Sequence, residues 1–81
     1  MSAELAAKEK VVGLKQTKRA IASGKVTKVF LAKDADPKLT EPLRAMCDLA
    51  QIAVVDTCAM SELGKSCGIA VGTAACAVLT K

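Results

Sequence analysis

A short basic segment, residues 13–19 (GLKQTKR), carries groups that could bind a phosphate and read the edge of a base. Gly13 lets another backbone approach closely, because glycine has no Cβ. We expect a helix to begin just after it, and a helix start offers unpaired N–H groups and a positive dipole end to phosphates. Lys15, Gln16 and Arg19 leave that helix start and add charge and a side-chain amide. The pattern fits a nucleic-acid contact, and it fits equally well the solvated basic face of an ordinary helix.

A second candidate segment is an apolar, glycine-containing loop near the C-terminus, residues 69–72 (IAVG). Such a loop could pack against an unstacked base, or it could be tucked into the protein's own core. The chain has one aromatic residue, Phe30, in a β-branched run that predicts a buried strand. Proteins that bind single strands stack bases on aromatic side chains. Any RNA bound here should therefore be prefolded and recognised by its shape, backbone and a few base edges.

The overall charge is compatible with an anionic partner but does not establish one. Twelve lysines and arginines against eight acidic residues leave a net charge of +4 and an isoelectric point near 9.0. Such a balance favours nucleic acid as a partner, although many basic proteins simply have a basic surface.

The residue types needed for common catalytic sites are missing. The chain has no histidine, which is the usual general base and a common metal ligand. The carboxylates are scattered, and Asp34 and Asp36 before Pro37 fit the formation of a turn and a helix cap. We therefore predict a protein that is not an enzyme and has no catalytic residue, cofactor, metal or small-molecule substrate.

The Gly-Lys-Ser run at residues 64–66 resembles the ending of a phosphate-binding loop. The full motif requires another glycine five residues before Gly64, where this chain has Ala59. The run also continues the apolar stripe of a helix, whereas the motif requires a flexible loop. We therefore do not expect nucleotide hydrolysis, and Lys65 is either a solvated surface lysine or a phosphate contact.

The four cysteines, at positions 47, 58, 67 and 76, form no C-x-x-C motif. Each lies beside apolar residues, and the N-terminus lacks the basic and then apolar start of a signal peptide. We interpret all four as small buried hydrophobic residues in a reducing cytosol, a disulfide-stapled secreted fold being the lesser alternative. No apolar run approaches the ~18 residues of a membrane span. We expect a cytoplasmic protein with no membrane partner.

The elements that must position these residues alternate along the chain. Eighty-one residues make one domain, residues 1–81, in which about half of the residues are apolar. Strands are expected over residues 11–12, 26–32, 52–55 and 74–79. Helices are expected over residues 2–10 and 15–23. A third helix is expected to begin at Pro37 and to restart at Pro42. A fourth is indicated by the apolar stripe of Met60, Leu63 and Cys67 and should end at Gly68. The alternation predicts an α/β fold, a three-layer α/β/α sandwich with a small mixed four-stranded sheet.

Two predicted helices carry stripes that assign their buried faces. Leu14, Thr17 and Ile21 share one face of the first, opposite the basic side chains. In the second, the buried positions are expected to be Leu43, Met46, Cys47 and Ala50.

Three pieces of the sequence together resemble the kink-turn-binding family of large-subunit ribosomal proteins, and most closely its short bacterial members. They are residues 13–20 (GLKQTKRA) with Gly24, residues 32–37 (AKDADP), and residues 63–72 (LGKSCGIAVG). The resemblance extends from about Lys10 to Leu79 and is carried by the order and spacing of the pieces. Archaeal members typically have Asn-Glu where this chain has Lys15 and Gln16.

The resemblance implies a non-catalytic protein that clasps a sharply bent RNA containing tandem sheared G·A pairs. By this resemblance the turn and helix start enter the widened groove, with Gln16 on the guanine edges and Lys15 beside it. Arg19 stands where the family usually has a lysine, and Ala70 replaces an acidic residue that is common in the loop. The expected RNA-binding residues are Gly13, Leu14, Lys15, Gln16, Arg19, Lys65, Ile69, Ala70 and Val71.

The expected partner is a structured RNA with a kink-turn, ribosomal RNA being one candidate, and the expected state is a monomer. A different class of function stays open beside it. In that alternative the protein is a structural or assembly factor that contacts other proteins through the apolar loop of residues 69–72.

Overall fold

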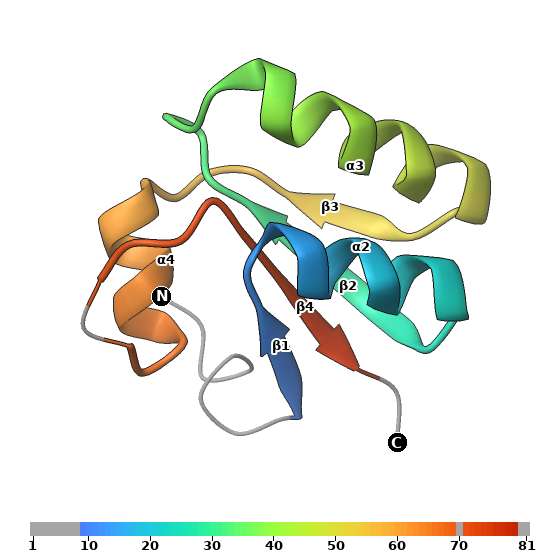
Figure 1. Cartoon of the computed structure of the whole chain (residues 1–81), viewed down its shortest axis with the longest axis horizontal. Helices are drawn as coiled ribbons and strands as arrows, with labels where there is room; N and C mark the ends of the chain where they lie inside the picture. Colours follow the sequence, from blue (N-terminus) through green and yellow to red (C-terminus); the bar gives the residue numbers. More distant parts are fainter. Residues whose placement is uncertain (1–8, 70, 80–81) are drawn as a thin grey trace.

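A four-stranded mixed sheet with helices on both faces forms the computed structural model, which describes residues 9–69 and 71–79 (Figure 1). The predicted α/β/α sandwich is confirmed. The elements in chain order are β1 (Lys10–Val12), α2 (Leu14–Ser23), β2 (Val26–Leu31), α3 (Pro37–Ala50), β3 (Ala53–Val55), α4 (Met60–Ser66) and β4 (Ala75–Leu79).

The strands lie in the order β1-β4-β2-β3. β2 and β3 are parallel, and β4 runs antiparallel to both of its neighbours, β1 and β2. The prediction of β2 as a central strand is therefore confirmed. Cys76 of β4 pairs with Val12 on one side and with Phe30 on the other. The end of β1, the end of β2 and the start of β4 consequently lie at the same edge of the sheet.

Alternate residues of the two central strands supply two separate hydrophobic clusters. Side chains of a strand point to opposite faces in turn, so residues two apart share a face. One face carries Val29, Leu31 and Ala77, which pack beneath α2 and α3. The other carries Phe30 and Cys76, which pack against α4. The expectation that Phe30 belongs to the core is confirmed, since it is 3% exposed.

A glycine ends one helix, and the cap and the proline predicted at the start of another are confirmed. Gly24 ends α2 in the left-handed conformation, with φ of 75°. The carboxylate of Asp36 accepts a hydrogen bond from the backbone N–H of Lys38 at 2.9 Å and so caps α3. Pro37 takes the first position of that helix, where its missing N–H is no loss.

Three predictions about the helices are wrong. α3 runs unbroken from residue 37 to 50 with Pro42 inside it, so no restart occurs there. Ala50, expected in the buried stripe with Leu43 and Cys47, is exposed because α3 ends at that residue. Lys10, expected to end a helix, is the first residue of β1 and pairs with Val78. The remainder of that helix, residues 2–8, lies outside the described residues.

Three of the four cysteines are buried as predicted. Cys47 lies in the cluster under α2 and α3, whereas Cys67 and Cys76 lie in the cluster under α4. Cys58 is only half-buried, in the segment between β3 and α4. Burial raises the pKa of the Cys47 thiol, an effect to which the adjacent Asp48 adds. Within the ranges that the structure describes, no three metal-ligating side chains come together.

The longest helix in the described part of the chain is α3, with 14 residues. No helix there is both long enough and apolar enough to cross a membrane.

Candidate functional site

The turn between β1 and α2 is tied directly to the start of β4. Gly13 occupies this turn with φ of 111°, a conformation that L side chains rarely adopt. Its N–H donates to the Ala75 carbonyl oxygen at 2.9 Å, and its own carbonyl accepts from the N–H of Thr17 at 2.9 Å. The first of these bonds fixes where α2 begins relative to the sheet.

The first turns of α2 present polar side chains to solvent and apolar ones to the core. Lys15, Gln16 and Arg19 are exposed, whereas Thr17 and Ile21 are buried. The amide of Gln16 bends back over the turn, and a Cβ on Gly13 would lie 2.5 Å from its Oε1 atom. The φ angle is what requires glycine at residue 13, because the flexible end of the Gln16 side chain could move away from a Cβ.

Positive charge at this helix start has no acidic partner among the residues that the structure describes. The first turn of α2 contains no acidic residue, and no side chain caps its N-terminus. The salt bridges found among the described residues join Arg44 to Glu41 and Asp56, away from α2. Lys15 and Arg19 have no carboxylate partner in that part of the chain, so their charge and the dipole of α2 favour an anion here.

The loop between α4 and β4 is held against α4 by two glycines. A Cβ on Gly64 would collide with the Val71 carbonyl oxygen and lie 3.0 Å from the Cα of Gly72. A Cβ on Gly72 would lie 3.1 Å from the Met60 carbonyl group. The N–H of Ile69 donates to the Gly64 carbonyl oxygen at 3.1 Å, which closes the start of the loop on the helix.

This loop presents an apolar side chain to solvent. Val71 is 71% exposed and Ile69 is half-buried, so at Val71 the loop is not tucked into the core. Lys65 is exposed on α4 just before the loop, without a described carboxylate partner. Ala70 lies outside the described residues.

The chain that leads from the candidate loop into β4 passes beside the turn before α2 at one edge of the sheet (Figure 1), while Val71 and Gly72 of the loop itself lie against α4. The N–H of Ala32, the residue after β2, donates to the Ala74 carbonyl oxygen at 2.8 Å, so the chain leaving β2 also lies at this edge. From there the Asp34 carboxylate accepts a hydrogen bond at 2.8 Å from the N–H of Met60, the first residue of α4. The sequence context of Asp34 and Asp36 predicts a turn and a local helix cap, whereas the Asp34 carboxylate binds the start of a helix distant in sequence, which was not predicted.

The structure places the predicted residues in two groups, one at the turn and the start of α2 near this edge and the other on α4 and the loop that packs on it, and contact of either group with RNA stays a prediction. Leu14 is half-buried and packs against the cluster under α2, so it supports the site more than it presents a surface. Sequence reasoning missed the structural roles of Gly64 and Gly72, which allow the loop to pack closely on α4. The signal was present, since both glycines stand in the resembling segment, but only the fold shows what lies opposite each of them.

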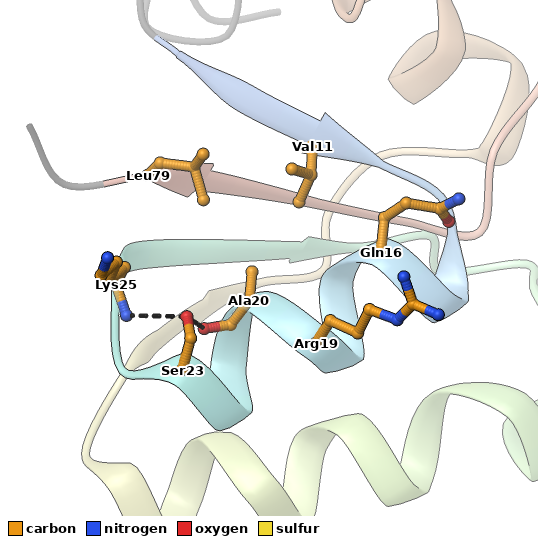
Figure 2. A pocket seen from close by; sticks show the side chains of 7 residues that line it. All are labelled: Val11, Gln16, Arg19, Ala20, Ser23, Lys25 and Leu79. Carbon is orange, nitrogen blue, oxygen red and sulfur yellow. Dashed lines mark hydrogen bonds between the residues drawn. The ribbon is translucent and has the colours of Figure 1, made fainter.

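A groove of about 360 Å³ runs along α2 on the side of β1. Figure 2 shows Gln16 and Arg19 leaving α2 at one end of this groove and Lys25 at the other. Val11 and Leu79 form its apolar floor, because β1 is an edge strand that α2 does not fully cover. Gln16 and Arg19 belong both to this groove and to the candidate site, so the two are continuous.

Residues 2–81 match the Ribosomal protein L7Ae/L30e/S12e/Gadd45 family. The chain belongs to this family. An RNA-binding protein named YbxF, from Geobacillus stearothermophilus, is 44% identical over 69 residues, which are 85% of this chain and 84% of that protein. An RNA-binding protein of Halalkalibacterium halodurans is 41% identical over 68 residues, covering 84% and 83% of the two chains.

Solved structures show the same L7Ae-type fold. A protein of unknown function from Bacillus halodurans superposes with a TM-score of 0.84 at 26% identity, over 95% of this chain and 77% of that one. The 15.5 kD RNA-binding protein of Giardia lamblia gives a TM-score of 0.87 at 21% identity, over 98% and 67%. The α/β/α arrangement is therefore shared well beyond the short bacterial proteins.

Proposed function

We propose that this protein binds folded RNA containing a kink-turn, and that it does so without catalysis. The observation that carries the proposal is the exposed basic start of α2, which has no acidic partner among the described residues and lies beside the chain that leads from the glycine-held loop into β4. One segment offers charge and an amide, and the other offers an exposed apolar side chain. The names of the bacterial relatives, which are RNA-binding proteins, support the same proposal and include no enzyme.

Each segment suits one feature of a bent RNA. Lys15 and Arg19 would lie on phosphates, and Gln16 would hydrogen-bond a base edge in the widened groove. Val71 and Ile69 would pack on an unstacked nucleotide, a contact that needs no aromatic side chain. Ribosomal RNA is a candidate target, and we propose that the protein acts as a monomer in the cytoplasm.

Titration against two RNAs of equal length at fixed salt tests the proposal. One RNA contains an internal loop with tandem sheared G·A pairs, and the other is a straight duplex. We expect the kinked RNA to bind at least about tenfold more tightly, which corresponds to about 1.4 kcal/mol. Equal affinity for both RNAs, or no binding to either, would contradict it. In that case the exposed Val71 would favour the alternative of a protein partner at the loop.

A matched pair of charge reversals places the interaction on the protein. Lys15→Glu at the start of α2 should weaken binding to the kinked RNA strongly. Lys25→Glu makes the same charge change beyond the far end of α2, roughly 15 Å away along the helix. We expect this control to bind nearly as the wild type does. An equal loss for both variants would indicate a general charge effect instead of a defined site.

A further inference from the structure

Two of the buried cysteines lie against each other. The Sγ atoms of Cys67 and Cys76 are 3.0 Å apart, and both side chains lie within the cluster under α4. Cys47 belongs to the cluster on the opposite face of the sheet, and Cys58 is in the segment between β3 and α4. The structure thus selects one pair from four thiols that look alike in the sequence.

This pair spans the candidate loop. Cys67 is the C-cap of α4, and Cys76 is the second residue of β4, so a bond between them would close a ring around residues 68–75. Cys76 is held between two neighbouring strands, through its pairing with Val12 and Phe30. Cys67 stands at the end of a seven-residue helix and is followed by Gly68 with φ of 79°. The helix end is therefore the side that can move.

We propose that Cys67 and Cys76 form a reversible disulfide when the protein meets a peroxide, and that this bond weakens binding at the candidate site. The part concerning binding rests on the function proposed above. A disulfide has an S–S distance of about 2.0 Å, so the two sulfur atoms must approach by about 1 Å. Because Gly64 already packs tightly on Val71 and Gly72, a shift of the end of α4 also shifts the loop.

The reaction balances with hydrogen peroxide as the oxidant. The Cys67 sulfur attacks one peroxide oxygen as its thiol loses its proton, the O–O bond breaks, and the departing hydroxide takes that proton, so that the products are a sulfenic acid on Cys67 and one water. The sulfur of Cys76 then attacks the Cys67 sulfur, the S–O bond breaks, and the departing hydroxide takes the Cys76 proton to form a second water. Two thiols and one peroxide thus give one disulfide and two waters.

The surroundings of the two thiols assign the order of these steps. Cys67 is 8% exposed and Cys76 is fully buried, so a small oxidant reaches Cys67 first. Burial, and secondly the hydrogen bond with Cys67, raises the pKa of the Cys76 thiol. Cys76 therefore stays protonated at neutral pH and reacts only with an activated neighbour.

Mass spectrometry of the wild-type protein after peroxide treatment tests the bond itself. We expect the intact mass to fall by that of two hydrogen atoms. A digest should contain a linked peptide pair with residues 67 and 76, and dithiothreitol should reverse both changes fully. Cys76→Val should abolish this mass change, whereas Cys47→Ala, which alters a buried thiol on the other face, should keep it. The proposal would be overturned if peroxide left the mass of the wild-type protein unchanged, or if Cys76→Val showed the same loss of two hydrogens.

Titration of reduced and oxidised protein against the kinked RNA tests the effect on binding. We expect affinity to fall several-fold on oxidation, to recover with dithiothreitol, and to be insensitive to peroxide in Cys76→Val. Unchanged affinity in protein shown to carry the disulfide would overturn the regulatory part alone. If reduced protein does not prefer kinked RNA, the proposed function fails and the regulatory part with it, whereas the mass result still decides on the bond.

Discussion

Gly64 is the residue on which the shape of the candidate loop depends most. The space for its Cβ is already occupied by the Val71 carbonyl oxygen, and Gly72 is also close. Gly64→Ala must push the loop away from α4, and overpacking of this kind costs about 1–3 kcal/mol. We expect the urea midpoint of unfolding to fall and binding to the kinked RNA to weaken.

Ser61→Ala provides the control for that variant. Ser61 is exposed on the same helix, and alanine is a better helix former there. Its free energy of unfolding should change by no more than about 0.5 kcal/mol. If Gly64→Ala is as stable as Ser61→Ala, the close packing of the loop on α4 is wrong.

Thr17 offers a second test at the scale of one side chain. Its hydroxyl is buried and has no hydrogen-bond partner among the described residues. An unsatisfied buried polar group costs about 1–3 kcal/mol, and valine has nearly the same shape. We therefore expect Thr17→Val to raise the free energy of unfolding, as measured by urea denaturation. A decrease would show that the hydroxyl has a partner, such as an internal water.

At the scale of elements, α3 tolerates a proline within its length. Pro42 has no N–H, so the bond to the carbonyl of Lys38 cannot form. The helix nevertheless continues, because Leu43 and Cys47 on its inner face are buried in the cluster with α2. The local preference of proline led to the prediction of a restart at residue 42. Packing of the inner face of α3 outweighs that preference.

Replacing this proline should stabilise the protein. Pro42→Ala restores the backbone hydrogen bond at an exposed position, and we expect a gain of about 1–3 kcal/mol in the free energy of unfolding. Pro37→Ala is the matched control, because proline suits the first position of a helix and should give no such gain. Equal effects of the two substitutions in urea denaturation would contradict this account of α3.

Local signals predicted the ends of elements better than they predicted the contacts between elements. Gly24 and Asp36 act within a few residues of themselves, so their capping could be predicted from the sequence. The bond from Met60 to Asp34 joins residues 26 positions apart, and the fit of Gly64 on Val71 depends on the path of a loop. Contacts of this kind follow from tertiary structure, which periodicity does not specify.

At the scale of the whole molecule, the candidate site is where the ends of β1 and β2 and the start of β4 meet. Its residues were identified from the sequence because charge and glycine cluster in two short segments. That the chain between the loop and β4 passes beside the turn before α2 could not be predicted from a local pattern, since no such pattern gives the strand order β1-β4-β2-β3. The pair of Cys67 and Cys76 was unforeseen for the same reason.

The salt dependence of binding should reflect the modest charge of the whole protein. Lys15, Lys18, Arg19 and Lys65 are the exposed basic residues on α2 and α4. If each neutralises one phosphate, log K should fall by about 3 to 4 per log unit of salt, at about 0.9 per contact. Titrations at increasing KCl measure this slope. Loss of the preference for kinked RNA at physiological salt would contradict recognition by shape.

Titration of Gln16→Ala and Arg19→Ala against both RNAs at fixed salt tests whether the start of α2 recognises the RNA. Gln16→Ala should weaken binding to the kinked RNA by about 1–3 kcal/mol and narrow its advantage over the straight duplex. Arg19→Ala should weaken binding to both RNAs more evenly, because it removes mainly charge. Both residues are exposed, so thermal stability should hardly change. If both variants bind the kinked RNA as tightly as the wild type does, this helix start is not the site.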